Sequence, residues 1–332
     1  MLRVIVIGGA GYIGSVVTEQ LINNGHTVFV YDNLTQGHLD AIHPEVGFIS
    51  RDISDKTALD DAFRKYRFDA VIDLAGETIV TDSMTNPYKY FKKNVVDNLN
   101  VLECMVKYKV FQIIFSSSST VYGEPTIIPI PENHPKNPDN SYGESKLIFE
   151  QMLKWYNRTF GIQFAALRYF NATGASKNRG EDHRPETHLI PIILNIALKK
   201  EGIVLVYGND YPTPDGTCIR GYTQVEDLAS AHVSVLENLW GLGSRGLGSN
   251  YYNVGTLKGY SVMEVIRTCK EVTGYDIPYK FMPRRPGDVS TMIADSTLLR
   301  TKLGWKPKHE EINSMIETSW KWMQKYPEGY AK

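Results

Sequence analysis

The sequence contains only three cysteines, Cys104, Cys218 and Cys269, and they lie far apart along the chain. None of them has a CxxC or Cys/His spacing, and their odd number does not suit a disulfide framework. We therefore expect reduced thiols, no bound metal and a cytoplasmic location.

Long apolar runs and an excess of one charge are also missing. No stretch approaches the roughly 20 apolar residues that span a bilayer, and the chain starts directly with strand-like residues rather than a signal-peptide pattern. The net charge of -1, with 22% charged residues, shows no basic excess for phosphate backbones. We expect a soluble protein whose partner is neither a membrane nor a nucleic acid, although a few local donors could still bind a small anion.

The sequence does contain a regular alternation of β-branched runs and amphipathic segments. Strands are expected at residues 3–9, 27–32, 46–50, 68–76, 111–119 and 162–171. Helices are expected at residues 15–25, 56–66, 87–108 and from about 142. Such alternation predicts an α/β fold with a parallel, Rossmann-type doubly wound sheet that helices cover on both faces.

After residue 171 the alternation gives way to long polar loops, 174–191 and 207–222. Loops of this length in a compact protein are more often functional than idle. We expect a first domain at residues 1–171, to which about 225–255 returns, and a smaller α/β domain at 172–332. Two more helices are expected there, at 261–274 and 316–326, and a flexible surface loop at 241–250.

Glycines fill the turn between the first expected strand and helix, where residues 8–14 read GGAGYIG. A GxxGxxG pattern in this place lets backbone amides approach a pyrophosphate at a helix N-terminus. A tight turn without a ligand would explain the glycines equally well, so a second feature is needed. Asp32 ends the next strand about 20 residues later, where a carboxylate binds the adenosine ribose and repels a 2′-phosphate. NAD is therefore favoured over NADP.

Asp52 follows the third expected strand and is a second candidate for the adenosine end of the cofactor. Its carboxylate could hold the adenine amino group. A surface aspartate that caps the next helix is an equally good interpretation.

Two Tyr/Lys pairs have the four-residue spacing that places both side chains on one helix face: Tyr88 with Lys92, and Tyr142 with Lys146. Spacing alone does not separate them. Ligands of parallel sheets lie beyond the carboxyl ends of the strands. Tyr142 opens a helix just after the loop that leaves the serine-rich end of the fifth strand, so we expect the second pair to be catalytic and the first to be an ordinary helical face.

The chemistry explains why a tyrosine and a lysine would be used together. A phenol with a pKa of about 10 is a weak base at neutral pH. A nearby ammonium and the positive nicotinamide of NAD⁺ both favour the phenolate and lower this pKa. A hydroxyl from residues 116–119 could hydrogen-bond the same substrate oxygen. The predicted reaction is oxidation of an alcohol carbon, with hydride passing to NAD⁺.

A series of motifs in the same order resembles the UDP-glucose 4-epimerases, a family of extended short-chain dehydrogenases/reductases, over nearly the whole chain. The motifs are GGAGYIGS, DNLTQGH, FSSSSTVYGEP, SYGESK, LRYFNATGA, GEDHRPETHLIP, YGNDYPTPDGTCIRGY, YNVGTLKGYSV and PRRPGD. The resemblance implies that NAD⁺ removes hydride from C4 of a UDP-sugar and returns it to the other face of the 4-keto intermediate. It also implies NAD binding by residues 1–171, UDP-sugar binding mainly by 172–332, and a homodimer packed through helices.

The resemblance implies three sets of site residues. The catalytic set is Ser118, Tyr142 and Lys146. The cofactor set is Gly8, Gly11, Tyr12, Ile13, Gly14, Asp32, Asn33, Leu34, Asp52, Ile53, Leu74, Ala75, Gly76, Asn94, Ser116, Tyr142, Lys146, Tyr169 and Phe170. The substrate set is Ser118, Thr120, Tyr142, Asn171, His188, Leu189, Leu205, Tyr207, Arg220, Arg285, Asp288 and Met292. Within it, Arg220 and Arg285 would hold the diphosphate, because a guanidinium fork suits phosphate oxygens.

Four positions depart from the pattern of this family. Asp73 replaces a histidine and Thr78 a lysine near the cofactor, while Gly221 replaces an aspartate and Gln224 a histidine. These changes lie away from the Ser/Tyr/Lys centre, so the chemistry is better supported than the affinity for NAD or nucleotide. Met292 lies where the family sets the width of the sugar pocket, and its size does not decide whether N-acetylated sugars fit.

Three rival functions are compatible with parts of this pattern. An epimerase acting on UDP-N-acetylhexosamines would use the same centre. A nucleotide-sugar 4,6-dehydratase would need an Asp-Glu pair after the catalytic hydroxyl, and Ser119 and Thr120 stand there. A silent NAD-binding regulator on the same fold would need neither the Tyr/Lys couple nor the late motifs.

Overall fold

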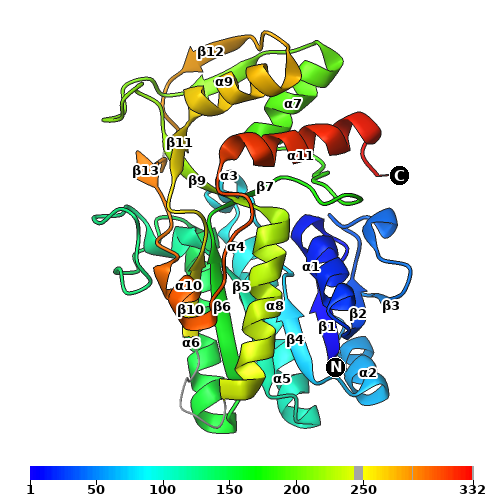
Figure 1. Ribbon diagram of the computed structural model, residues 1–332. Coiled ribbons are helices and arrows are strands. Elements are labelled where there is room, and N and C mark those ends of the chain that lie inside the picture. The colour runs from blue at the N-terminus through cyan, green and yellow to red at the C-terminus, as the bar shows by residue number, and fades with distance from the viewer. Residues whose placement is uncertain (243–249, 286, 331–332) are drawn as a thin grey trace. The chain divides into compact units, whose positions relative to one another are not determined.

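A computed structural model describes residues 1–242, 250–285 and 287–330, so most of the expected surface loop at 241–250 lies outside the described residues. The chain forms two compact units (Figure 1). The first contains residues 1–123, 135–169 and 229–252, and the second contains 124–134, 170–228 and 253–332.

The first unit is built on a seven-stranded sheet with the order β10-β6-β5-β4-β1-β2-β3. Its strands are β1 (Arg3–Ile7), β2 (Thr27–Asp32), β3 (Gly47–Ser50), β4 (Ala70–Asp73), β5 (Gln112–Ser118), β6 (Gln163–Tyr169) and β10 (Asn250–Val254). The pairings from β3 through β6 are all parallel. The strand order reverses between β1 and β4, which is the position where such sheets bind ligands. All six expected strands are present, and the predicted Rossmann-type fold is confirmed.

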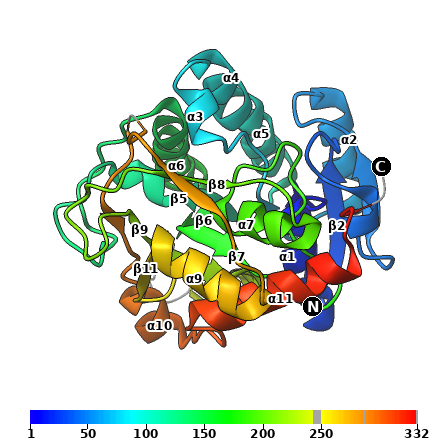
Figure 2. The same ribbon diagram turned by 90° about the horizontal axis from the view of Figure 1, so that it is seen from above.

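Helices cover both faces of this sheet (Figures 1 and 2). They are α1 (Tyr12–Asn23), α2 (Lys56–Tyr66), α3 (Val80–Ser83), α4 (Pro87–Phe91), α5 (Asn98–Tyr108), α6 (Ser141–Phe160) and α8 (Val225–Leu242), with short 3-10 turns η1 (Leu39–Ala41) and η3 (Ser119–Tyr122). Helices α2, α5 and α6 lie on one face and α1 on the other. Phe63, Phe115, Phe149 and Phe164 belong to one buried cluster under the first of these faces, which accounts for the apolar character of the strands.

The helix expected at 87–108 contains a π-helical segment, η2 (Lys92–Asp97), between α4 and α5. Apolar spacing does not reveal such a segment, because the pattern on either side is that of an ordinary helix. Lys92 and Lys93 both form ion pairs with Asp97 at its end. Asn94, one of the expected cofactor residues, lies inside η2, and π-helical turns are frequent at functional sites.

The start of α6 is fixed by a side-chain cap. Asn140 has an extended backbone, and its side-chain oxygen accepts a hydrogen bond from Gly143 N at 2.8 Å. The helix ends at Gly161, whose φ of 76° is in the left-handed region that glycine tolerates best. The cap places Tyr142 in the first helical turn, with Lys146 one turn later.

The second unit has two smaller sheets. Strand β9 (Ile219–Gln224) pairs with β11 (Gly259–Ser261), β13 (Thr291–Met292) and β7 (Asn171–Thr173), and β8 (Val204–Tyr207) pairs with β12 (Tyr279–Met282). Its helices are α7 (Leu189–Lys199), α9 (Val262–Thr273), α10 (Thr297–Leu303) and α11 (Ile312–Lys325). The helices expected at 261–274 and 316–326 are α9 and α11. Ser261 and Glu264 form a capping box at the start of α9.

Two expectations from composition can be compared with the structure. Cys104, Cys218 and Cys269 are buried free thiols. Within the described ranges, no helix is both long and apolar enough to cross a membrane.

Candidate active site

The turn between β1 and α1 leaves no room for a side chain at Gly8 or Gly14. Gly8 has a φ of +77°, and a Cβ at Gly14 would lie 2.1 Å from the Gly8 carbonyl oxygen. Gly11 is the N-cap of α1 and provides no side-chain cap, and Tyr12 and Ile13 form the first turn behind it. A bare helix N-terminus of this kind suits the phosphates of a dinucleotide, so these residues fit the NAD predicted from the sequence.

Asp32 lies beside this turn at the end of β2. Its carboxylate is buried and accepts hydrogen bonds from Ala10 N at 2.9 Å and Leu34 N at 2.8 Å. Burial raises the pKa of Asp32, while these two backbone donors lower it. The two bonds fix the carboxylate between the glycine turn and the Asn33–Leu34 segment, where the ribose of NAD would bind.

Asp52 lies near the same end of the sheet. Its Oδ2 accepts hydrogen bonds from Asn33 Nδ2 at 2.6 Å and Lys93 Nζ at 3.2 Å. Burial raises its pKa, but bonds from Ser54, Asn33 and Lys93 outweigh burial and hold the pKa well below its usual range. Asp55, not Asp52, caps α2 by accepting Ala58 N at 3.0 Å. The helix-cap interpretation of Asp52 is therefore wrong, and Ile53 beside it is buried.

Tyr142 and Ser118 form the centre of the candidate site. The Tyr142 side chain is buried, with its ring edge-on to Tyr90 at a centroid distance of 6.2 Å. Burial raises the pKa of Tyr142, and a hydrogen bond with the Ser118 side chain lowers it. Ser118 Oγ also accepts bonds from Thr120 N at 3.2 Å and Thr120 Oγ1 at 2.9 Å. These contacts bring the hydroxyls of Ser118, Thr120 and Tyr142 together.

Lys146 is buried close to this centre. Its Nζ donates to the carbonyl of Ser116 at 2.8 Å and lies 4.8 Å from the centre of the Phe115 ring. Burial lowers the pKa of Lys146 to about 8, although Asp73 acts in the opposite direction. The lysine is thus held in place by the backbone at the end of β5.

Asp73, the residue that departs from the family histidine, ends β4 and is fully buried. Its Oδ1 accepts Ala75 N at 3.2 Å, whereas its Oδ2 has no hydrogen-bond partner within the described part of the chain. Burial raises the pKa of Asp73 to about 6, and the charge of Lys146 partly opposes this rise. Asp73 is therefore a titratable carboxyl whose charge acts on that of Lys146.

Asn94 connects the loop after β4 to α6. Its Oδ1 accepts Glu77 N at 2.7 Å, and its Nδ2 donates to Glu77 O and to Ser145 Oγ, both at 3.0 Å. Gly76 has a φ of +148°, and a Cβ there would lie 2.7 Å from the Asn94 side chain. Asn94 thus fixes the segment that contains the expected cofactor residues Leu74, Ala75 and Gly76.

The second Tyr/Lys pair is in a different environment. Tyr88 is 77% exposed, and Lys92 pairs with Asp97 in the π-helical segment. By contrast, Tyr142 is 9% exposed and Lys146 is 1% exposed. Burial separates two pairs that have the same spacing.

Sequence reasoning missed His232, which lies on α8. Its Nε2 is 2.5 Å from the hydroxyl of Tyr169, at the end of β6. Burial raises the pKa of Tyr169, and a bond with Ser116 lowers it. Phe170 was expected to lie with Tyr169 at the cofactor. It is the first residue of segment 170–228, which belongs to the second unit. A lone histidine in a helix gives no sequence signal that would have identified this contact.

The second unit brings several expected substrate residues together. Arg220 on β9 is paired with Met292 on β13, and its guanidinium lies 3.7 Å from a carboxylate oxygen of Asp288. The guanidinium of Arg285 lies 3.9 Å from the centre of the Tyr207 ring. Two arginines, an aromatic ring and a carboxylate are groups that suit a nucleoside diphosphate.

The remaining expected substrate residues have separate contacts. Asn171 Nδ2 donates to the Gly221 carbonyl at 2.9 Å. Leu205 on β8 is exposed, and Leu189 begins α7. His188 is the N-cap residue of α7 and directs its Nδ1 toward Glu181 and Glu186, both at 2.8 Å.

Among the other departures, Gln224 has a structural explanation, Gly221 has none, and Thr78 is exposed in the first unit. A Cβ at Gly221 would meet only ordinary contacts of 3.5 Å or more, so glycine is not required there. The buried Gln224 donates to Ala175 O at 3.0 Å and accepts Asp227 N at 3.3 Å. Gln224 therefore helps to satisfy the backbone at the start of α8.

Comparison with known sequences shows a match over most of the chain. Residues 4–255 match the NAD dependent epimerase/dehydratase family. The chain is 44% identical over 331 residues to a UDP-glucose 4-epimerase of Lactobacillus helveticus, and the match covers 99% of both chains.

Solved structures give the same result. UDP-glucose 4-epimerase from Brucella ovis in complex with NAD is 40% identical with a TM-score of 0.92, covering 97% of this chain and 98% of that one. The enzyme from Bifidobacterium longum in complex with NAD⁺ and UDP is 36% identical with a TM-score of 0.92, covering 99% of this chain and 100% of that one.

Proposed function

This chain belongs to the NAD dependent epimerase/dehydratase family, and we propose that it interconverts UDP-glucose and UDP-galactose through transient oxidation at C4 of the sugar. The family resemblance of the sequence motifs is thus confirmed. The observation that carries the proposal is the buried centre in which Tyr142 hydrogen-bonds Ser118, with the buried Lys146 one helical turn away.

The first unit has the groups that would hold NAD. The amides after Gly11 would bind the pyrophosphate, Asp32 the adenosine ribose, and Asp52 the adenine. Bound NAD⁺ supplies the acceptor for the C4 hydride and the donor for its return. The position of Tyr169 at the end of β6 supports its assignment to the nicotinamide side, and Asn94 would support the cofactor segment after β4.

Tyr142 would act as both base and acid within one turnover. It removes the proton from the O4 hydroxyl in the oxidation step and returns it after the ketone has been reduced. Ser118 holds the same oxygen by a hydrogen bond. The buried phenol has a raised pKa in the protein by itself, so the charge of Lys146 and of the bound cofactor must lower it for this role.

The second unit would bind the UDP part of the substrate. Arg220 and Arg285 suit the diphosphate, and Leu205, Tyr207 and Asp288 suit the uridine. Asn171, His188, Leu189 and Met292 complete the proposed substrate set. The Bifidobacterium longum protein, which shares 36% of its residues with this chain, was solved with UDP, and this supports the assignment.

Proton NMR of the products would also detect two other activities. An epimerase for UDP-N-acetylhexosamines would require room for an acetamido group beside Met292. A 4,6-dehydratase would require an acid and a base after Ser118, where the chain has Ser119 and Thr120. The epimerase proposal is favoured because these hydroxyls do not supply that pair.

The test is proton NMR of purified protein incubated with UDP-glucose or with UDP-galactose, without added reductant. The same mixture of both sugars should form from either starting sugar. If neither C4 epimer forms from the other at saturating NAD⁺, the proposal is wrong.

We further propose a cytoplasmic homodimer packed through helices of the first unit. Large apolar side chains are exposed on these helices and the residues next to them: Met84, Tyr88, Val96 and Trp155. An interface between two copies of the chain would cover these side chains. Light scattering should give twice the chain mass, and a monomer at micromolar concentration would contradict this part of the proposal.

A further inference from the structure

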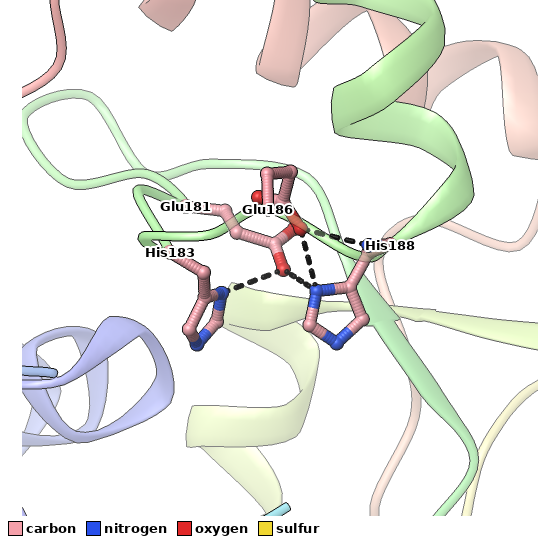
Figure 3. Close-up of side chains that lie close together, drawn as sticks. All are labelled: Glu181, His183, Glu186 and His188. Carbon is pink, nitrogen blue, oxygen red and sulfur yellow. Dashed lines mark hydrogen bonds and ion pairs between the residues drawn. The ribbon is translucent and has the colours of Figure 1, made fainter. Parts of the chain in front are cut away.

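Four side chains that could ligate a metal converge in the loop before α7, and Figure 3 shows them. Glu181, His183, Glu186 and His188 each place one donor atom within 4.8 Å of all the others. Donors that share one tetrahedral zinc ion are about 3.4 Å apart, because each zinc bond is about 2.1 Å long. The four atoms are therefore already near the arrangement that a single ion would require.

The contacts inside the cluster come from both carboxylates. Glu181 Oε1 lies 3.1 Å from His183 Nδ1 and 2.8 Å from His188 Nδ1. Glu186 Oε1 lies 2.8 Å from His188 Nδ1 and accepts the backbone N–H groups of Thr187 and His188, both at 2.8 Å. In Figure 3 the Nδ1 atoms face the carboxylates, and the second ring nitrogens turn away.

The geometry at His188 suits an ion better than it suits hydrogen bonds alone. Nδ1 carries at most one hydrogen, yet two carboxylate oxygens approach it at the same 2.8 Å. One hydrogen cannot point directly at both oxygens, and hydrogen bonds weaken steeply when bent. A cation placed among the three donors would contact each of them without this conflict.

The charge and burial of the two carboxylates also favour a bound cation. The side chains of Glu181 and Glu186 are only 7% and 15% exposed, so two carboxylate charges lie side by side with little water. A divalent cation held between them would neutralise both carboxylates. Neutral imidazole is the form of histidine that binds a metal.

We propose that Glu181, His183, Glu186 and His188 form a binding site for one divalent transition-metal ion, with zinc as the best match. A set of two imidazoles and two carboxylates in a roughly tetrahedral arrangement is suited to zinc. The ion would tie the loop at 181–186 to the N-terminus of α7. The site revises the expectation of no metal, and it does not depend on the proposed catalytic activity.

The experiment measures metal binding directly. The full-length protein is dialysed against a chelator, titrated with Zn²⁺ in competition with a chromophoric chelator, and its metal content is measured by mass spectrometry. We expect one zinc per chain. Glu181→Gln, which keeps side-chain size, and His183→Asn, which removes the imidazole, should each weaken zinc binding at least about tenfold.

His43→Asn is the matched control. His43 also lies next to a glutamate, and its Nδ1 accepts Glu45 N at 3.2 Å, but it belongs to the first unit. This variant should bind zinc as tightly as the unaltered protein. The absence of stoichiometric zinc, or equal affinity in all three variants, would overturn the proposal.

A second measurement needs no variant and covers the case of a variant that does not fold. Zinc should raise the melting temperature of the chelator-treated unaltered protein, because an ion that binds the folded state stabilises it. An unchanged melting temperature at a saturating zinc concentration would also overturn the proposal. Neither readout uses epimerase activity, so failure here and failure of the proposed function are distinguishable.

Discussion

Two opposing influences act on the phenol of Tyr142. Burial disfavours its ionised form, and the hydrogen bond with Ser118 favours it. The protein without cofactor is therefore in a resting state with a neutral phenol. In the proposed reaction, the charges of Lys146 and of bound NAD⁺ would lower the pKa of Tyr142 so that it can accept the O4 proton.

Removing the Tyr142 hydroxyl tests this role. Tyr142→Phe should lower kcat roughly 10²-fold or more, the scale of a lost general acid/base, because the O4 proton then has no acceptor. Steady-state kinetics with UDP-galactose measures this. Tyr88→Phe is the matched control, since Tyr88 has the same spacing to a lysine but is 77% exposed, and its activity should be unchanged. Retained activity in Tyr142→Phe would remove Tyr142 from the mechanism.

Asp73 gives a prediction about pH. Its carboxyl has a pKa of 3.8 when unperturbed and about 6 in the fold. Between these values the folded state binds more protons than the unfolded one, so this group lowers stability as pH rises from about 4 to about 6. Relative to the unaltered protein, Asp73→Asn should gain up to roughly 3 kcal/mol of unfolding free energy between pH 4 and pH 7.

Urea unfolding of the unaltered protein and of Asp73→Asn, each at pH 4 and at pH 7, measures this gain in unfolding free energy. The contributions of other titratable groups cancel because both proteins contain them. A difference that does not change with pH would show that Asp73 ionises normally.

At the scale of elements, a buried ion pair joins α6 to β6 beneath the catalytic end of the sheet. Glu150 accepts hydrogen bonds from Arg168 Nε at 2.9 Å and Nη2 at 2.7 Å, and also from Ser117 Oγ at 2.6 Å. Arg168 Nη1 donates to the Tyr122 hydroxyl at 2.9 Å. These contacts fix α6 against β5 and β6.

Breaking this pair should destabilise the whole first unit. Glu150→Gln leaves the Arg168 charge buried without its counterion, which costs about 3–5 kcal/mol of unfolding free energy. Chemical denaturation measures the loss. Glu317→Gln is the control, because Glu317 and Lys321 form an exposed i,i+4 pair on α11 and such pairs contribute about 0.5 kcal/mol or less. Equal effects of the two substitutions would contradict this account.

At the scale of the whole molecule, the sequence predicted those parts that follow a local rule. The alternation of strands and helices gave the parallel sheet, and the glycine turn followed by Asp32 predicted a dinucleotide site whose backbone geometry the structure shows. Strand order also favoured Tyr142 over Tyr88. The signals were periodicity for the sheet, a fixed spacing for the dinucleotide site, and the place of Tyr142 in the order of strands and helices.

Other features depend on contacts between distant segments and could not be predicted. The unpaired oxygen of Asp73 depends on how β4 packs near Lys146, and the contact of His232 with Tyr169 joins α8 to β6. The π-helical turn at Asn94 has the apolar pattern of an ordinary helix. Glu181 and His188 converge through a loop without periodicity, so their spacing predicted no metal site.

The most direct test of the proposed reaction follows a deuterium label at C4 of UDP-glucose. If Tyr142 and bound NAD⁺ oxidise and then reduce the same carbon, UDP-galactose should retain the deuterium at C4 when NMR and mass spectrometry are used to locate it. A dehydratase would deliver the label to C6 of a deoxy sugar, and a silent NAD-binding protein would leave UDP-glucose unchanged. Deuterium found at any carbon other than C4, or no UDP-galactose at all, would contradict the account.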